Sequence, residues 1–299
     1  MPRFCANLSF LFPEVAFSER FERAAKAGFR GVEYPFPYAF EMDDLAYRLR
    51  EYGLTQVLLN LPAGDWERGE RGIACLPGRE LEFREAVDLG LTYAKKLACT
   101  QLNCLAGLAP LGVSEAAIRS TFKANLRYAA QRLGEQGIRL LIEPINSRVD
   151  MPGFWLDTPR KALTLMSELA EPNLYLQYDM YHAQIMEGDL ARTIEAHLEH
   201  IAHFQIADNP GRHEPGTGEI NYPYLFARLD NLGYTGWIGC EYTPRLPGNA
   251  SLVWAQPWLE VSHLMLRSDP CDVWPSQSSR ECPALPPLPL GEGWGEGAF

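Results

Sequence analysis

Four side chains that carry oxygen ligands lie within or directly after apolar, strand-like segments in the second half of the chain. A buried carboxylate is costly unless it is paired or bound to a cation, so acids that recur at the ends of successive strands indicate a shared site. For any one of them the alternative is an N-cap of the following helix, which is the commoner role of a single acid there. Because four such residues occur at equivalent positions of four predicted strands, a shared site is favoured. These residues are Glu143, Asp179, Gln205 and Glu241.

The four residues supply only oxygen ligands, which suit a hard or borderline divalent cation such as Mg²⁺ or Mn²⁺. Three carboxylates against two positive charges also give a reasonable local balance. All 6 histidines lie at or after His182. A trinuclear zinc phosphodiesterase on a comparable barrel would need several imidazole ligands on the early strands, so the sequence argues against an endonuclease.

Three further residues are candidates to bind a substrate. His182 follows Asp179 by three positions, in a predicted loop where it could donate to a substrate oxygen or simply bond to backbone. Arg212, shortly after the seventh predicted strand, and Arg71, in a long loop over 61–78, could hold an anionic substrate through bidentate contacts. The alternative for both arginines is an ordinary surface position. His203 lies within a strand, which favours a packed core histidine.

The elements that must position these residues alternate between strand-like and helix-like with a period of about 30 residues, the length of a βα unit. Eight such units predict a parallel sheet closed into a single (β/α)8 TIM barrel, with its active site at the C-terminal ends of the strands. An open doubly wound sheet is the second choice, but no glycine-rich dinucleotide or phosphate-binding motif is present, so no nucleotide cofactor is expected. The predicted strands span 3–8, 31–34, 55–60, 101–105, 138–143, 174–179, 201–207 and 236–241, and the predicted helices include 43–52, 81–97, 114–135, 190–199 and 222–232.

The composition of the chain limits the classes of partner and the compartment that can be expected. The 299 residues hold 27 Lys and Arg against 38 Asp and Glu, a net charge of −11 that disfavours nucleic acid and anionic membranes. No apolar run reaches the ~18 residues that span a bilayer, and no secretory signal is recognised, so a cytoplasmic protein is expected. The 7 cysteines contain no Cys-x-x-Cys pair and are expected to be free thiols. Residues 1–266 form the predicted catalytic domain, and the Pro- and Gly-rich tail 267–299 is expected to be disordered.

The chain resembles the hydroxypyruvate isomerase family, within the xylose isomerase-like barrels, from Met1 to about Trp258. The resemblance implies interconversion of hydroxypyruvate and tartronate semialdehyde, with Glu143 and Glu241 transferring the proton through an enediolate. The partner is then a small anionic hydroxy-oxo acid, and both a monomer and a homo-oligomer stay open. The motifs that carry the resemblance include Gly28-Phe29-Arg30-Gly31-Val32-Glu33, Leu141-Ile142-Glu143-Pro144-Ile145-Asn146, Gln177-Tyr178-Asp179-Met180-Tyr181-His182 and Pro215-Gly216-Thr217-Gly218-Glu219-Ile220.

Several alternatives remain within this resemblance. The 2-oxo-tetronate isomerases share much of the pattern, and a ketose epimerase or a sugar dehydratase could use the same ligands. Related ketose 3-epimerases place a metal-binding histidine where this chain has Gln205, so the cation is either weakly held or dispensable. Leu59 stands where the resemblance leads us to expect a histidine, which would remove one substrate contact.

Overall fold

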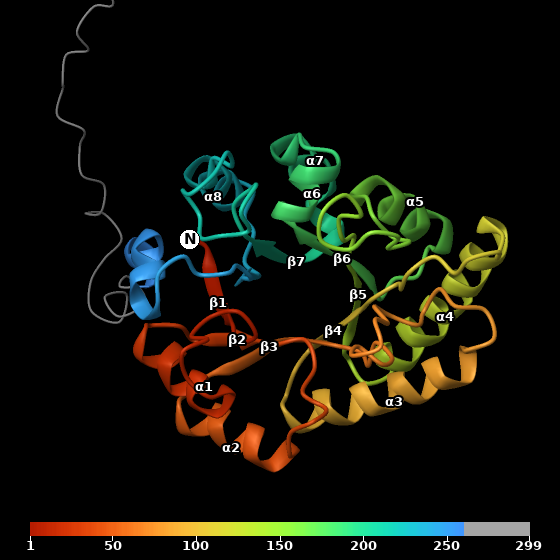
Figure 1. Cartoon of the computed structure of the whole chain (residues 1–299), viewed down its shortest axis with the longest axis horizontal. Helices are drawn as coiled ribbons and strands as arrows, with labels where there is room; N and C mark the ends of the chain where they lie inside the picture. Colours follow the sequence, from red (N-terminus) through yellow and green to blue (C-terminus); the bar gives the residue numbers. More distant parts are fainter. Residues whose placement is uncertain (260–299) are drawn as a thin grey trace, which may run out of the picture. The chain divides into compact units, whose positions relative to one another are not determined.

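A closed barrel of eight parallel strands forms the centre of the computed structural model, which describes residues 1–259 (Figure 1). Each strand pairs with the next along the chain, and the last pairs with the first, Arg3 beside Trp237. This closure confirms the predicted TIM barrel and excludes the open doubly wound sheet. The strands are β1 Arg3–Asn7, β2 Gly31–Glu33, β3 Thr55–Asn60, β4 Gln101–Cys104, β5 Arg139–Ile142, β6 Leu174–Asp179, β7 Ile201–Ile206 and β8 Trp237–Cys240.

Helices surround the barrel and cover the outer face of its sheet (Figure 1). Their apolar faces pack against the strands, as Phe122 and Leu126 of α4 do within the buried core. The α-helices are α1 Phe17–Lys26, α2 Met42–Glu51, α3 Glu80–Lys96, α4 Glu115–Gly134, α5 Pro159–Leu169, α6 Met180–Met186, α7 Leu190–His197 and α8 Tyr222–Asn231, and two 3₁₀ helices are η1 Leu198–His200 and η2 Gly248–Ala255.

Two helices begin where their sequence predicts. The Ser114 hydroxyl accepts a hydrogen bond from the Ala117 backbone N–H and caps α4. The Thr158 hydroxyl does the same for the Lys161 N–H, and Pro159 occupies the first turn of α5. Each cap satisfies a backbone donor that has no partner within the helix, which fixes where the helix starts.

One helix was not predicted. The sequence analysis placed a loop after the sixth strand, but α6 starts at Met180, directly after β6. Asp179 ends the strand and also caps the helix, because its Oδ1 accepts from the backbone N–H groups of Tyr181 (2.8 Å) and His182 (3.3 Å). Placing His182 in a loop was therefore wrong. The helix has 7 residues and no intervening turn residue, so neither periodicity nor a Gly or Pro signal marks it.

Two glycines allow close approaches inside the barrel. A Cβ at Gly31 would lie 2.8 Å from the side chains of Trp237 and Val57. A Cβ at Gly239 would overlap the Glu33 carboxylate. The absence of a side chain at Gly239 of β8 leaves room for the Glu33 carboxylate at the base of the site, and any larger residue would displace it.

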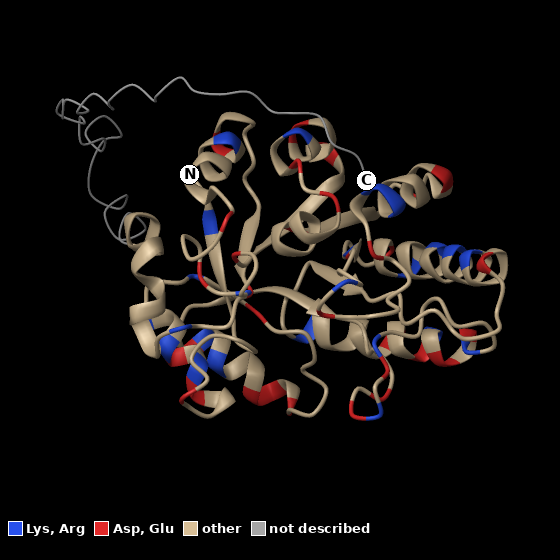
Figure 2. Ribbon diagram, turned by 45° about the horizontal axis from the view of Figure 1, so that its top comes forward, with Lys and Arg blue, Asp and Glu red and all other residues tan. Residues whose placement is uncertain are grey.

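The outer helices carry basic and acidic residues interspersed (Figure 2). Ion pairs join neighbouring helices, such as Arg119 of α4 with Glu168 of α5 at 2.6 Å. Among residues 1–259, no helix is both long and apolar enough to cross a membrane. The five cysteines in this range are free and buried, as expected. The predicted boundary at 266 and the predicted disordered tail lie outside the described residues.

Candidate active site

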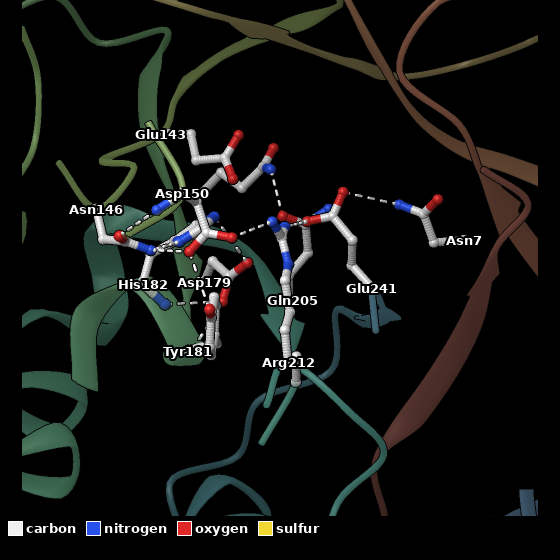
Figure 3. A network of polar contacts seen from close by, with 12 residues as sticks. Asn7, Glu143, Asn146, Asp150, Asp179, Tyr181, His182, Gln205, Arg212 and Glu241 are labelled. Carbon is white, nitrogen blue, oxygen red and sulfur yellow. Dashed lines mark hydrogen bonds and ion pairs between the residues drawn. The ribbon is translucent and has the colours of Figure 1, made fainter. Parts of the chain in front are cut away.

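The predicted strand-end residues converge at the C-terminal end of the barrel (Figure 3). Glu143 directly follows β5, Asp179 ends β6, Gln205 lies in β7 and Glu241 directly follows β8. All four are buried, with at most 8% of each residue's surface exposed. Glu143 and Glu241 line the same small, partly open cavity, with a volume of about 20 Å³. Two carboxylates that are distant in sequence therefore face one small space.

Glu143 has few groups to stabilise a negative charge. Its Oε2 accepts a hydrogen bond from Asn103 Nδ2 at 2.8 Å. Burial, followed by the charges of Glu241 and Asp179, raises the pKa of Glu143 well above its ordinary value. Burial and these neighbouring acids therefore favour the protonated form of Glu143 near neutral pH.

Glu241 is surrounded differently. Its Oε1 accepts from Asn7 Nδ2 at 3.1 Å, and its Oε2 accepts from the Arg212 guanidinium at 3.2 Å. Burial raises the pKa of Glu241 to about 8, while the positive charge of Arg212 acts in the opposite direction. Of the two glutamates, Glu241 is the one that ionises more readily, because a cation and an amide both favour its charged form.

Arg212 bridges the two sides of the site (Figure 3). It forms ion pairs with Asp150 at 3.1 Å and with Glu241 at 3.2 Å, and it lies over the rings of Phe10 and Tyr181. Burial works against its charge, but the neighbouring carboxylates outweigh burial and raise the pKa of Arg212. Its Nε is buried and has no hydrogen-bond partner among residues 1–259. Arg212 thus keeps one unused donor beside Glu241, although it does not itself line the cavity.

Arg71 is not brought to this cluster. Its guanidinium donates to the backbone oxygens of Trp66 (3.0 Å) and Glu70 (2.7 Å) and lies 4.2 Å from the Trp66 ring centroid. The backbone of the loop that carries Arg71 packs closely on the segment after β4. A Cβ at Gly72 would overlap the Leu105 backbone oxygen. Binding of the substrate by Arg71 therefore stays a prediction.

His182 faces the other end of the cluster from α6. Its Nδ1 lies 2.7 Å from Asn146 Nδ2, and its Nε2 lies 3.7 Å from Asp179 Oδ2. Burial and the charge of Arg212 lower the pKa of His182 well below its ordinary value, so the ring is neutral. His182 is thus beside the predicted site residues, as its spacing from Asp179 suggested.

The cluster fits a divalent cation only in part. Ligand atoms of Glu143, Asp179 and His182 lie within 4.8 Å of one another, and Asp179 Oδ2 is buried without a hydrogen-bond partner in the described chain. Gln205 Oε1 already accepts from Gln177 Nε2 at 2.6 Å and its amide donates to Glu33, so its role as a cation ligand stays a prediction. Glu143 and Asp179 are the predicted ligands whose oxygens suit a hard cation.

A buried Glu–His pair that the sequence does not predict lies beneath the site. Glu33, at the end of β2, contacts His203 of β7 at 2.7 Å, and both side chains are almost fully buried. Burial alone would raise the pKa of Glu33, but His203 and the donors Gln205 and Asn7 lower it below its ordinary value. His203 is in the core, as predicted, but it is paired with a charge. The distance is that of a hydrogen bond, shorter than the ~3.3 Å between two ligands of a tetrahedral zinc ion.

A signal for the missed residues was present in the sequence. Polar side chains also end or nearly end the early strands: Asn7, Glu33, Asn60 and Asn103. They follow the same pattern as Glu143 and Asp179, but three of them are amides, and a search for cation ligands passes over them. Asn103 connects the polar residues of the early strands with those of the later strands, since its Nδ2 donates to Asn60 and to Glu143.

Comparison with known proteins places this geometry in a family. The model of the xylose isomerase-like TIM barrel family matches residues 21–261. The hydroxypyruvate isomerase of Escherichia coli is 52% identical over 258 residues, which cover 86% of this chain and 100% of that protein. The chain belongs to the xylose isomerase-like TIM barrel family. The resemblance read from its motifs is thereby confirmed.

Two further relatives extend the match. The 2-oxo-tetronate isomerase of Cupriavidus necator is 48% identical over 259 residues, covering 87% of this chain and 99% of that protein. A crystal structure from Brucella melitensis, titled AP endonuclease, family 2, has a TM-score of 0.84 and 50% identity, covering 86% of this chain and 99% of that one. Strands β2 to β8 and the four predicted strand-end residues lie inside the residues that the family model matches.

Proposed function

We propose that the protein is an isomerase that interconverts hydroxypyruvate and 2-hydroxy-3-oxopropanoate (tartronate semialdehyde). The observation that carries the proposal is the pair Glu143 and Glu241, which face one cavity and differ in their neighbours, since only Glu241 is hydrogen-bonded to Arg212. The 52% identity to a protein named hydroxypyruvate isomerase supports the substrate. An aldose–ketose isomerisation needs one base and one acid at adjacent carbons and no redox cofactor.

The reaction begins at the hydroxyl-bearing carbon of hydroxypyruvate. Ionised Glu241 removes a proton from C3, and the electron pair forms the C2–C3 double bond of an enediolate. Glu143 then donates its proton to C2 while the C3 oxygen becomes the aldehyde, with its hydroxyl proton passing to the C2 oxygen. Atoms and electrons balance within the substrate, and the two glutamates exchange protonation states, which prepares the enzyme for the reverse reaction.

Arg212 binds the carboxylate of the substrate in this proposal. Its buried, unpartnered Nε–H supplies a charged donor next to Glu241, and its contacts with Asp150 and Glu241 hold the guanidinium in place. The same guanidinium keeps Glu241 ionisable next to other acids. A cation held by Asp179 would add positive charge near the substrate oxygens as a Lewis acid, and Glu143 would join it as a ligand only after losing its proton. Exhaustive chelation tests it: full retention of activity would rule out an essential ion.

A second candidate is isomerisation of a 2-oxo-tetronate, favoured by the 48% identity to the Cupriavidus necator enzyme of that name. The same base, acid and carboxylate contact would serve a four-carbon acid. The deciding experiment is incubation of each acid in deuterated buffer with proton NMR detection. Appearance of the aldehyde with deuterium in the product supports isomerisation, and the ratio of the two kcat/KM values selects the substrate. Loss of water or epimerised six-carbon sugars would instead identify a dehydratase or an epimerase.

A further inference from the structure

Asn146 holds its side-chain amide in one orientation. Its Oδ1 accepts hydrogen bonds from the backbone N–H groups of Val149 at 2.9 Å and Asp150 at 3.0 Å. If the amide were turned over, its NH₂ group would face these two donors and all of these bonds would be lost. The backbone therefore determines that the Nδ2 side of Asn146 points away from these N–H groups.

This orientation places a proton donor against His182. Asn146 Nδ2 lies 2.5 Å from Asp150 Oδ2 and 2.7 Å from His182 Nδ1, so its two hydrogens have one acceptor each (Figure 3). An amide NH₂ group only donates, so His182 Nδ1 must be the acceptor and carries no proton. The single proton of the neutral imidazole is then on Nε2.

The Nε2 side of His182 faces an unfilled acceptor. Asp179 Oδ2 is 3.7 Å away, which is too long for a hydrogen bond, and it has no other partner in the described chain. A ring nitrogen of His182 and a carboxylate oxygen of Asp179 both lie within 4.8 Å of a Glu143 carboxylate oxygen. A substrate hydroxyl between His182 and Asp179 satisfies both groups at once, because it accepts from Nε2–H and donates to the carboxylate.

We propose that Asn146 is a positioning residue that holds His182 as the Nε2–H tautomer, so that His182 donates a hydrogen bond to a substrate oxygen and does not ligate a cation. The substrate part of this inference rests on the proposed isomerase function, whereas the tautomer part does not. A cation on Nε2 would require the proton to move to Nδ1, where it would face the NH₂ group of Asn146. His182 therefore acts as a neutral electrophile beside the developing enediolate.

The tautomer is measured directly by ¹⁵N NMR of the full chain labelled at histidine. The protonated and unprotonated ring nitrogens give separate signals, and a His182→Gln variant assigns them. We expect a protonated Nε2 and an unprotonated Nδ1, unchanged when Mg²⁺ is added. A proton on Nδ1, with or without Mg²⁺, would overturn the proposal whether or not any variant folds.

An exchange of two residues tests the role of Asn146. The double variant Asn146→Asp/Asp150→Asn keeps the total charge and allows a hydrogen bond between the two side chains, but it places an acceptor against His182 Nδ1. We expect Nδ1 to become protonated in this variant. Asp150→Asn alone is the matched control and should retain the proton on Nε2, because Asn146 is still present. An unprotonated Nδ1 in the double variant would contradict the positioning role.

Kinetics separate this inference from the proposed function. Loss of one donor to a developing oxyanion lowers kcat by about 100-fold, and we expect that loss in the double variant relative to Asp150→Asn, with a smaller change in KM. Equal kcat values in the two proteins would contradict the substrate contact. If the wild-type protein shows the Nε2–H tautomer but turns over no hydroxy-oxo acid, the proposed function fails and the tautomer assignment stands.

Discussion

The two sides of the cavity present the same functional group in different surroundings. On one side, Glu143 receives a single amide hydrogen bond from Asn103 and lies near the acidic Asp179. On the other side, Glu241 receives an amide hydrogen bond from Asn7 and a charged one from Arg212. The strand ends are equivalent in the barrel, but the donors around them are not.

This difference assigns the chemistry. A carboxyl group in an apolar, acidic environment holds its proton, whereas one beside a guanidinium ionises. Arg212 reaches the site from the segment after β7, which supplies no other predicted site residue. In the proposed mechanism, the barrel provides two similar acids, and a single loop arginine makes Glu241 the base.

The largest effect is expected from removing either glutamate. Glu143→Gln and Glu241→Gln should each lower kcat by at least ~100-fold, because each removes one of the two groups that move the proton. Turnover of hydroxypyruvate measures both variants. Near-normal turnover in either one would remove that residue from the mechanism.

Deuterium exchange sharpens the comparison between the two sides. If Glu241 is the base for hydroxypyruvate, Glu143→Gln should still exchange the C3 protons with deuterated buffer more rapidly than it forms aldehyde. Glu241→Gln should lose both reactions together. Retained exchange in Glu241→Gln, with loss in Glu143→Gln, would reverse the assignment of acid and base.

Arg212 is predicted to have the next largest effect. Arg212→Gln should raise KM for the acid substrate about 10- to 100-fold, since a hydrogen bond to a charged group contributes about 1.5–3 kcal/mol. Arg84, exposed on α3 with its guanidinium over Tyr128, provides the control variant Arg84→Gln, which should leave KM unchanged. An unchanged KM in Arg212→Gln would place the carboxylate of the substrate elsewhere.

The same measurement examines Arg71. If its predicted contact with the substrate forms, Arg71→Gln should raise KM as well, although its guanidinium rests on Trp66 in the structure. A KM equal to that of the wild type would show that Arg71 has no part in binding. A raised KM would add a second arginine to the binding of the substrate, whereas an unchanged KM would leave Arg212 as the arginine that binds it.

The pH dependence of kcat/KM is a smaller but more specific test. Glu241 must be ionised to act as a base, so kcat/KM should rise with pH as this group, with a pKa of about 8, loses its proton. At still higher pH it should fall, because Glu143 then loses the proton it must donate. Arg212→Gln should move the rising limb to higher pH, since a positive charge is removed. A flat profile across about two pH units around this pKa would contradict the assignment.

The sequence predicts the barrel and one half of the site well. Each strand carries an apolar run ended by a polar residue, and the periodicity places Glu143 and Glu241 at the same end of a closed sheet. The element that comes after a strand is harder to infer. α6 is short and starts without a turn, so the sequence favours Asp179 as a site residue, and the structure shows that it is also the N-cap of this helix.

The partners of these residues depend on contacts across the barrel. Glu33 and His203 lie on β2 and β7, 170 positions apart, and no local pattern joins them. Gln205 was predicted as a cation ligand from its place in β7, but its oxygen is directed by Gln177 and by the acceptor Glu33. Hydrogen-bond direction is a property of the assembled network, so spacing could place this side chain but could not orient it.

The smallest expected effect is on stability, and it opposes the effect on activity. The folded protein holds the proton of Glu143 at pH values where the unfolded chain, with a glutamate pKa near ~4.3, has lost it. The unfolded state then binds fewer protons, so the free energy of unfolding falls as pH rises above that value. Glu143→Gln removes this cost and should be more stable than the wild type at neutral pH.

Urea unfolding as a function of pH measures this effect. The advantage of Glu143→Gln should grow with pH above ~4.3, and each 1 kcal/mol should raise Tm by about 2–4 °C. Glu85→Gln, at an exposed position of α3, is the control and should show no such gain. If Glu143→Gln were no more stable than the wild type at any pH, the apolar, acidic environment that makes Glu143 the proton donor would be wrong, and with it the contrast between the two sides of the cavity.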